Sequence, residues 1–147
     1  MNWFDAVAMM DELGLALPSE AQWECGARGG TSTVFWTGND VATLQGAANI
    51  ADEYGKSHGA ENWPDWERGF DDGNTSHAIV GSYRANSFGL HDVHGNVWEW
   101  CLDGFDGEAY GPGRRVDPVV PPEGALKRVD RGGSFSYASW FSRCAIR

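Results

Sequence analysis

Regular hydrophobic periodicity ends early in this chain, and this limits its fold more than any other feature. Apolar residues recur at helical spacing from Asn2 to Leu13 and again from Ser19 to Arg28. Beyond Gly29-Gly30, the stretch from Thr37 to Asn74 is rich in Gly, Asn, Asp and Ser, which is typical of turns. Aperiodic stretches of this length are usually either disordered or functional. Aromatic residues in and beside it favour an ordered, packed loop: Trp36, Trp63, Trp66 and Phe70.

Both helical segments carry start and stop signals. Asn2 can cap the first helix and Gly14 can end it. Ser19 and Gln22 form a capping-box pattern at the start of the second helix, which Gly29-Gly30 ends. Short strands are predicted further on, at Ala78–Ser82, Val97–Leu102 and Arg128–Ser134. With 20 Gly and 8 Trp in the chain, this pattern predicts a loop-rich fold and not a helical bundle.

Charge and length exclude several classes of protein. The 147 residues correspond to one domain, and the formal net charge of −10 excludes a basic nucleic-acid-binding surface. No stretch approaches the roughly 20 apolar residues of a membrane span, so no membrane insertion is expected. The residues after Met1 do not resemble a signal peptide. The cellular compartment stays open, because 3 Cys allow at most one internal disulfide and do not indicate a redox environment.

The segment from Phe88 to Trp100 is the richest in side chains that could bind a metal or take part in a reaction. Asp92 and Glu99 lie on either side of Gly95, where a tight turn can direct backbone carbonyls inward. Two carboxylates, two carbonyls and water match the roughly 6–8 oxygen ligands that Ca²⁺ prefers, whereas Mg²⁺ takes fewer protein ligands. A Gly-Asn turn leading into a Trp-rich core strand, with Glu99 in a salt bridge, explains the same residues.

A second oxygen-rich group consists of Asn49-Ile50 and Asp71–Asn74, although Asp-Asp-Gly-Asn is also a common turn sequence. A zinc site is not expected. His91 and His94 have no third ligand at a recognisable interval, and the cysteines form no CxxC pair.

Several motifs, taken together, resemble the formylglycine-generating enzyme family, also called the sulfatase-modifying factor domain. The resemblance covers nearly the whole chain and implies an α+β fold of the C-type-lectin-like kind, as a single domain over residues 1–147. It also implies that the family's extreme N- and C-terminal segments are missing. In chain order the motifs are Leu17-Pro-Ser-Glu-Ala-Gln-Trp-Glu24, Ala27-Arg-Gly-Gly30, Phe35-Trp-Thr-Gly-Asn39, Ala48-Asn-Ile50, Val80-Gly-Ser-Tyr83, Asn86-Ser-Phe-Gly-Leu90, Gly95-Asn-Val-Trp-Glu-Trp100 and Arg131-Gly-Gly-Ser134.

The resemblance implies two structural Ca²⁺ sites. The first set of ligands corresponds to Asn49, Ile50, Asp72 and Asn74, of which Ile50 and Asn74 contribute carbonyls. The second set corresponds to Asp92, Gly95, Val97 and Glu99, of which Gly95 and Val97 contribute carbonyls. A cation at either site would crosslink loops that have few backbone ladders, and its binding free energy would stabilise the fold.

The activity of the family is not expected here. In the family, two Cys that follow the Arg131-Gly-Gly-Ser134 motif bind Cu(I) during oxidation of a substrate Cys to formylglycine, and thiolates suit that ion. Tyr137 stands where the first Cys is expected, and the remaining segment holds only Cys144. A copper cofactor is therefore not expected. The related ergothioneine-type sulfoxide synthases need a further iron-binding helical domain, for which this chain has no room.

The sequence allows more than one role for the cysteines. Cys101 and Cys144 either form a disulfide or remain two buried thiols, which behave as small apolar residues. Cys25 is expected to be packed within the second helix.

The C-terminal segment mixes large aromatic and small side chains without a helix or strand period. It is similar to the variable segment of family members encoded by diversity-generating retroelements. If exposed, its side chains predict a surface for a protein or cell-surface ligand, because aromatic residues give contact area at low entropy cost. If buried, its rings belong to the core. The candidate ligand-binding residues are Phe135, Ser136, Tyr137, Ser139, Trp140, Phe141, Ser142, Cys144 and Ile146.

Three functions are compatible with these observations. The preferred one is a non-catalytic, Ca²⁺-stabilised binding module of the C-type-lectin-like kind. The alternatives are an oxidase of the formylglycine-generating kind and an accessory domain of a larger regulatory or surface protein.

Overall fold

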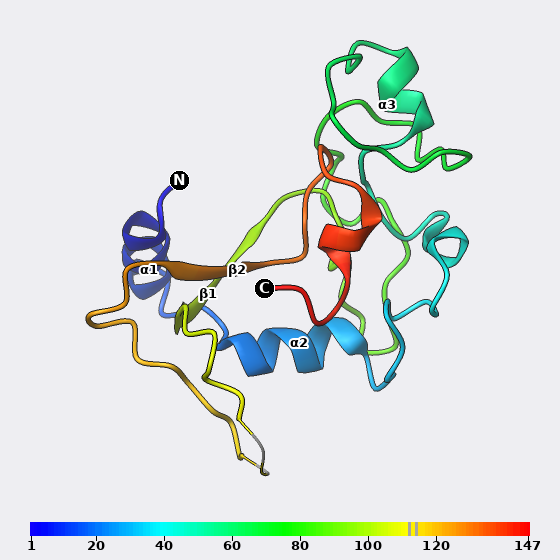
Figure 1. Ribbon diagram of the computed structural model, residues 1–147. Coiled ribbons are helices and arrows are strands. Elements are labelled where there is room, and N and C mark those ends of the chain that lie inside the picture. The colour runs from blue at the N-terminus through cyan, green and yellow to red at the C-terminus, as the bar shows by residue number, and fades with distance from the viewer. Residues whose placement is uncertain (112, 114) are drawn as a thin grey trace. The chain divides into compact units, whose positions relative to one another are not determined.

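The computed structural model describes residues 1–111, 113 and 115–147. Its helices are α1 (Trp3–Glu12), α2 (Glu20–Arg28) and α3 (Glu53–Ser57), with 3₁₀ turns at Val41–Leu44 and Ser139–Ser142 (Figure 1). Strands β1 (Glu99–Gly104) and β2 (Arg128–Arg131) pair in a two-stranded sheet. The other described residues form turns, loops and isolated bridges, so the predicted α+β fold with little regular structure is confirmed.

The chain forms two compact units. Unit 1 comprises residues 1–24, 100–131 and 147, and unit 2 comprises residues 25–99 and 132–146. Every predicted calcium ligand and every candidate ligand-binding residue belongs to unit 2.

The predicted helix signals act as expected. The Asn2 side chain accepts a hydrogen bond from the Asp5 N–H at 3.0 Å, and Gly14 follows α1 with φ of +69°. At α2 the capping box is reciprocal. Gln22 N–H donates to Ser19 Oγ at 3.2 Å, and Ser19 N–H donates to Gln22 Oε1 at 3.0 Å. These local bonds satisfy backbone donors that a helix start leaves without partners.

Two of the three predicted strands correspond to β1 and β2, but the strand predicted at Ala78–Ser82 is wrong. This segment forms a turn, in which Ile79 and Val80 are 85% and 84% exposed. The Ala78 N–H donates to Asn96 Oδ1 at 2.8 Å, and the Gly81 N–H donates to Asp92 Oδ2 at 2.7 Å. Side chains from a distant loop thus replace the ladder partners that a strand would need.

The aperiodic stretch is ordered around the core of unit 2, which consists of Phe35, Leu44, Ala48, Ile50 and Phe70. Of the aromatic residues singled out in the sequence, Phe70 lies in this core, while Trp36, Trp63 and Trp66 are half-buried. Helix α3 was not predicted. It is little more than one turn long, and Asp52 caps its start, because Asp52 Oδ1 accepts the Gly55 N–H at 2.8 Å.

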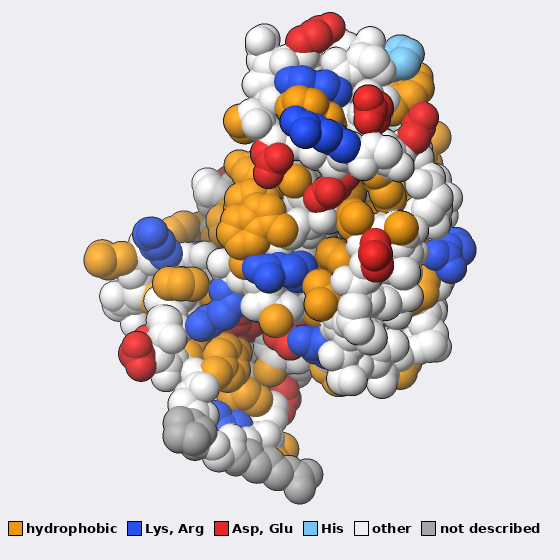
Figure 2. All heavy atoms as spheres, turned by 45° about the vertical axis from the view of Figure 1, so that its right-hand side comes forward, with side chains coloured by type: hydrophobic (Ala, Val, Ile, Leu, Met, Phe, Trp, Pro, Cys, Tyr) orange, Lys and Arg blue, Asp and Glu red, His pale blue; other side chains and the backbone are white. Residues whose placement is uncertain are grey.

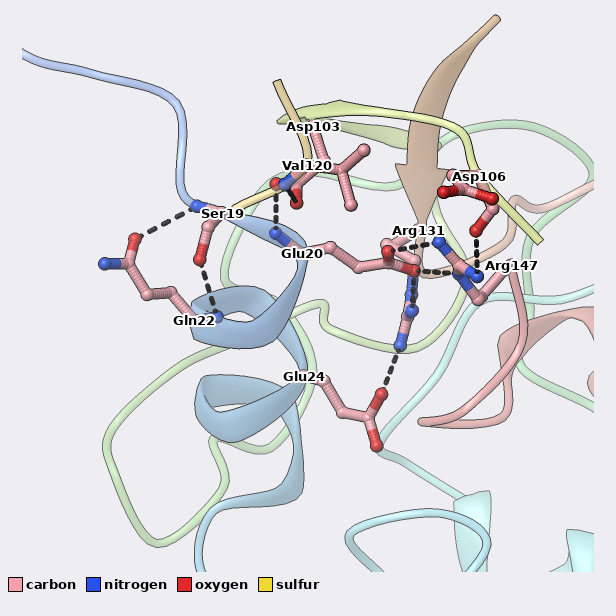
Figure 3. A network of polar contacts seen from close by, with 9 residues as sticks. All are labelled: Ser19, Glu20, Gln22, Glu24, Asp103, Asp106, Val120, Arg131 and Arg147. Atoms are coloured by element: carbon pink, nitrogen blue, oxygen red, sulfur yellow. Dashed lines mark hydrogen bonds and ion pairs between the residues drawn. The ribbon is translucent and has the colours of Figure 1, made fainter. Parts of the chain in front are cut away.

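Unit 1 contains a buried ionic network around Glu20 (Figure 3). Arg131 Nη1 lies 2.6 Å from Glu20 Oε1, and Arg131 Nη2 lies 2.9 Å from Glu24 Oε2. Asp103 anchors the same region, because its Oδ2 accepts the Glu20 N–H at 2.7 Å and its Oδ1 accepts the Val120 N–H at 2.8 Å. Burial of the Glu20 and Arg131 charges is tolerated since the two are paired with each other.

The cysteines differ in exposure. Cys101 and Cys144 are fully buried. Cys25 is exposed, so the prediction that it is packed is wrong. The buried residues of α2 include Trp23 and Ala27, one helical turn apart, and Cys25 lies two residues from each, on the opposite face. Within the described residues, no helix combines the length and apolar character needed to cross a membrane.

Candidate functional site

Two loops that carry predicted calcium ligands meet at Asn49 and Gly95. These residues form a parallel bridge, and the Asn96 N–H donates to the Asn49 carbonyl at 2.7 Å. Gly95 and Asn96 have φ of +77° and +62°, which places both in the left-handed region. A Cβ at Gly95 would overlap the Asn49 carbonyl. Glycine is therefore required here both for backbone conformation and for space.

Hydrogen bonds join three residues of the first predicted ligand set. The Ile50 N–H donates to Asp72 Oδ2 at 2.8 Å, and the Asn74 N–H donates to Asp72 Oδ1 at 2.9 Å. Asn49 is fully buried, and its Nδ2 donates to the Ser76 carbonyl at 3.0 Å. Its Oδ1 is buried and has no hydrogen-bond partner within the described part of the chain. An amide oxygen in this condition fits a cation ligand, because an unsatisfied buried acceptor is costly.

Negative charge is concentrated at this first set. Burial, with smaller contributions from the nearby carboxylates of Asp52 and Asp71, raises the pKa of Asp72 to about 7. Burial also raises the pKa of Asp52. Tyr83, whose hydroxyl accepts a hydrogen bond from Asn74 Nδ2 at 2.8 Å, has its pKa raised to about 12, mainly by burial and then by the charge of Asp72. A bound cation would offset this charge.

The second predicted ligand set surrounds the Gly95-Asn96 turn. Asp92 has φ of +58°, and its Oδ2 accepts the Gly81 N–H at 2.7 Å. Its Oδ1 is a second buried acceptor without a hydrogen-bond partner among the described residues. The Val97 side chain is 49% exposed, which is compatible with a role for its carbonyl alone, and Glu99 is the first residue of β1. The buried Asp92 oxygen, like Asn49 Oδ1, therefore fits a ligand of an oxygen-preferring cation.

The histidines beside this turn have structural roles. His94 is fully buried, its Nε2 accepts the Trp36 N–H at 3.1 Å, and burial lowers its pKa to about 4. His91 Nδ1 lies 2.7 Å from the Tyr83 carbonyl. In the residues that the structure describes, no three His, Cys, Asp or Glu side chains come together as a metal-binding group. The predicted calcium sets depend accordingly on amide and carbonyl oxygens as much as on carboxylates.

The C-terminal segment is divided between surface and interior. Tyr137 and Trp140 are 42% and 46% exposed, and Phe135, Ser136, Phe141 and Ile146 are half-buried. Ser139, Ser142 and Cys144 are buried, so the expectation that these three contribute to a ligand-contacting surface is corrected. The two serines are buried because they lie in the 3₁₀ turn Ser139–Ser142, which leaves the Trp140 ring exposed. Cys144 follows this turn, and its N–H donates to the Val34 carbonyl at 2.9 Å.

Backbone hydrogen bonds join this segment to the loops that carry the predicted calcium ligands. The Gly95 N–H donates to the Gly132 carbonyl at 2.7 Å, and the Phe135 N–H donates to the Asn96 carbonyl at 3.0 Å. The Ala51 N–H donates to the Tyr137 carbonyl at 3.0 Å. The backbone of the C-terminal segment is thus bonded to both of these loops.

Glu67 provides a further anchor that the sequence analysis missed. Its Oε1 accepts hydrogen bonds from both the backbone N–H and the hydroxyl of Ser139, the former at 2.9 Å. Ser139 is thus a support of the segment. No local pattern links two residues so far apart in the sequence.

The exposed rings line a groove of about 540 Å³ in unit 2. One wall comes from the C-terminal segment (Ser136, Tyr137, Ala138, Trp140, Phe141), and the other comes from the loop Trp63-Pro64-Asp65. Tyr137 and Phe141 pack edge to face at 4.9 Å between ring centroids, and the centroid of the Trp98 ring lies 5.6 and 6.4 Å from theirs. On the face drawn in Figure 2, exposed hydrophobic groups gather among acidic and basic side chains. Rings held in this way offer a preformed surface.

Comparison with known proteins assigns the family. The family model described as "Sulfatase-modifying factor enzyme 1-like domain" matches residues 1–147. The chain belongs to this family. The sulfatase-modifying factor family was predicted from the motifs, and its fold explains why so few residues here lie in regular elements.

Several curated relatives of this sulfatase-modifying factor domain are named "Formylglycine-generating enzyme". The protein from Thermomonospora curvata is 36% identical over 142 residues, which cover 92% of this chain and 43% of the relative. The protein from Streptomyces coelicolor is 39% identical over 143 residues, which cover 92% of this chain and 40% of the relative. The chain thus spans about two-fifths of the length of these relatives.

Two solved structures share this fold. The structure titled "Treponema denticola variable protein 1" matches with a TM-score of 0.56 and 27% identity, over 87% of this chain and 39% of that chain. PvdO from Pseudomonas aeruginosa matches with a TM-score of 0.65 and 28% identity, over 95% of this chain and 49% of that chain. These matches confirm the predicted C-type-lectin-like fold of the family.

Proposed function

We propose that this domain is a non-catalytic binding module, in which two calcium-braced loops hold an aromatic groove for a protein or cell-surface partner. The observation that carries the proposal is the combination of exposed Tyr137 and Trp140 rings with a backbone fixed by hydrogen bonds to the loops of Asn49 and Asn96. Fixed rings lose little conformational entropy on binding, which favours affinity.

Calcium has a structural role in this proposal. Asn49, Ile50, Asp72 and Asn74 would hold one ion, and Asp92, Gly95, Val97 and Glu99 would hold the other. The buried acceptors Asn49 Oδ1 and Asp92 Oδ1 support these sets, because each is an oxygen without a hydrogen-bond partner in the described residues. When bound, the ion would supply only electrostatic crosslinking of loops, and the recognition itself would rest on the aromatic side chains.

The similarity to Treponema denticola variable protein 1 supports a further element of the proposal, namely that the exposed positions of the segment accept different side chains. The division of the segment into buried supports (Ser139, Ser142, Cys144) and exposed rings (Tyr137, Trp140) fits such a design. Variation at the exposed positions would change the partner without changing the packed residues that hold the segment.

The proposal is tested by partner capture with matched variants. The wild type, the double variant Tyr137→Ala/Trp140→Ala and the control Phe88→Ala are immobilised in Ca²⁺, and proteins and surface glycans from the source organism's environment are bound. Phe88 is 58% exposed in unit 2 but does not line the groove. A partner that binds the wild type and the control equally, and the double variant at least tenfold more weakly, supports the groove. Equal binding to all three contradicts it.

The curated relatives support a second candidate, an oxidase that converts a substrate Cys to formylglycine. Against it, Tyr137 stands where the resemblance implies a copper-binding Cys, and Cys144 is fully buried, with its N–H bonded to the Val34 carbonyl at 2.9 Å. Incubation with a Cys-containing peptide, Cu(I) and oxygen, followed by mass spectrometry, separates the two functions. Turnover that exceeds a no-protein control and disappears in Cys144→Ala would establish the oxidase and refute the non-catalytic proposal.

A further inference from the structure

Hydrogen bonds join three segments of unit 2 that lie far apart in the chain. The Ala51 N–H donates to the Tyr137 carbonyl at 3.0 Å, and the Glu67 N–H donates to the Ala51 carbonyl at 2.8 Å. Asp52 and Glu67 also form a parallel bridge. Ala51 is fully buried, and its two backbone groups bond to different segments. The backbone of Ala51 therefore links the segment of Glu67 to the C-terminal segment.

The Glu67 side chain makes a second, direct link to the C-terminal segment. Its Oε1 accepts hydrogen bonds from the Ser139 N–H, at 2.9 Å, and from the Ser139 hydroxyl. Ser139 is the first residue of a 3₁₀ turn, and Ala138 before it has no side-chain acceptor. The Glu67 carboxylate thus caps this turn from a distant segment. Together with the backbone bonds of Ala51, this contact closes a ring of hydrogen bonds.

This ring joins the two walls of the aromatic groove. Glu67 closely follows the loop Trp63-Pro64-Asp65, and Ser139 directly precedes Trp140 of the opposite wall. Neither Glu67 nor Ser139 is among the residues that line the groove. The contact that holds the walls is therefore separate from the rings that the groove presents to a partner.

We propose that Glu67 is the positioning residue of the aromatic groove. Its carboxylate sets the spacing of the two walls, and this spacing is kept when the exposed rings are exchanged for other side chains. The inference rests on the proposed function, because it assigns a role within the same groove. Glu67 acts through Ser139 and does not itself contact the partner. Walls that are fixed before binding lower the entropy cost of ordering them in a complex.

Amide hydrogen exchange of the whole chain, followed by heteronuclear NMR without any ligand, tests this role. In the wild type, the Ser139 N–H should exchange at least tenfold more slowly than in an unstructured peptide of the same local sequence. Glu67→Ala should accelerate this exchange at least tenfold. Glu67→Gln keeps an acceptor oxygen and should accelerate it less than threefold. An unprotected Ser139 N–H in the wild type, or equal exchange in the wild type and Glu67→Ala, would refute the proposal.

A matched glutamate distinguishes a local role of Glu67 from general loosening of its loop. Glu53 Oε2 also accepts a backbone hydrogen bond, but from Gly69 of the same loop, at 3.0 Å. Glu53→Ala should therefore leave exchange of the Ser139 N–H within twofold of the wild type. If Glu53→Ala accelerates this exchange as much as Glu67→Ala does, the carboxylate of Glu67 has no special position and the proposal is wrong.

The spacing of the walls is measured by a second signal, the NOE between the ring protons of Trp63 and Phe135. The centroids of these rings lie 6.5 Å apart, one in the loop wall and one at the start of the C-terminal segment. The NOE should persist in Tyr137→Ala/Trp140→Ala and lose at least half its intensity in Glu67→Ala. The reverse pattern would overturn the proposal. Because neither measurement uses a partner, failure here and failure of partner capture are recognised separately.

Discussion

The guanidinium groups of Arg131 and Arg147 meet on one carboxylate, that of Glu20 (Figure 3). Arg131 Nη1 lies 2.6 Å from Glu20 Oε1, and Arg147 Nε lies 2.7 Å from the same oxygen. In the chain these two arginines flank residues 132–146, the segment that carries the proposed binding surface. Both ends of this segment are therefore held at one buried point, whatever side chains it exposes in between.

The Glu20 pairing predicts unequal effects of two similar substitutions. Glu20→Gln should destabilise the protein by about 3–5 kcal/mol, because it leaves buried Arg131 without its main counter-charge. Glu24→Gln should cost less than about 1 kcal/mol, since the Glu24 side chain is 32% exposed and is screened by solvent. Urea unfolding of both variants measures the difference, and equal losses would show that Glu20 is not the centre of the network.

Removal of calcium should lower the melting temperature. At a Ca²⁺ concentration about 100-fold above the dissociation constant, one site contributes about 2.7 kcal/mol, so chelation should lower Tm by roughly 5–10 °C. Asp92→Asn retains an acceptor for the Gly81 N–H but loses the ligand charge, and should reduce this shift. Asp65→Asn, which lies outside both ligand sets, should respond to chelation as the wild type does. A wild-type Tm that is insensitive to chelation contradicts the structural role of calcium.

Gly95→Ala and Gly89→Ala separate steric overlap from backbone strain. Both glycines have positive φ, +77° and +80°, but only at Gly95 would a Cβ meet the Asn49 carbonyl. We expect Gly95→Ala to be less stable than Gly89→Ala by at least about 1–3 kcal/mol, the usual cost of overpacking. Chemical denaturation compares the two variants directly. Similar stabilities would indicate that the Asn49 and Gly95 loops adjust easily.

The loss of stability caused by a substitution in the C-terminal segment should depend on whether the replaced side chain is buried. Trp140→Ser should cost less than about 2 kcal/mol, because the ring is 46% exposed. Cys144→Tyr should destabilise by at least about 3 kcal/mol, since the site is fully buried and cannot hold a ring. Thermal melts of both variants test this division. A well-folded Cys144→Tyr variant would contradict the assignment of Cys144 as a packed support.

Substitution of Asp130 by Asn should stabilise the protein, and the gain in stability should depend on pH. Burial raises the pKa of Asp130 in the folded state, so the folded form binds the proton more tightly than the unfolded form, and stability falls as the pH rises through this range. Asp130→Asn removes the cost of burying the charge. The variant should melt at a higher temperature than the wild type at pH 7, and the advantage should shrink as the pH approaches about 4. A constant advantage across this range would assign the gain to a cause other than ionisation.

Much of the local structure could be predicted because the signals involve neighbouring residues. The cap at Asn2 and the box of Ser19 and Gln22 each join residues three positions apart, and the structure shows both. The strand predicted at Ala78–Ser82 failed for the opposite reason, since its N–H groups bond to Asn96 and Asp92, which no local pattern could indicate.

The ordered motifs by themselves determined the family and the fold, and they predict which residues form the two calcium-ligand sets. Only the tertiary structure decided which C-terminal side chains face solvent, that Glu67 holds Ser139, and that Trp63 and Asp65 form the second wall of the groove. Helix caps and turns depend on hydrogen bonds between residues a few positions apart, so a local sequence pattern can predict them. The exposure of a side chain depends on contacts between segments that are distant in the sequence, and no periodic pattern marks such contacts.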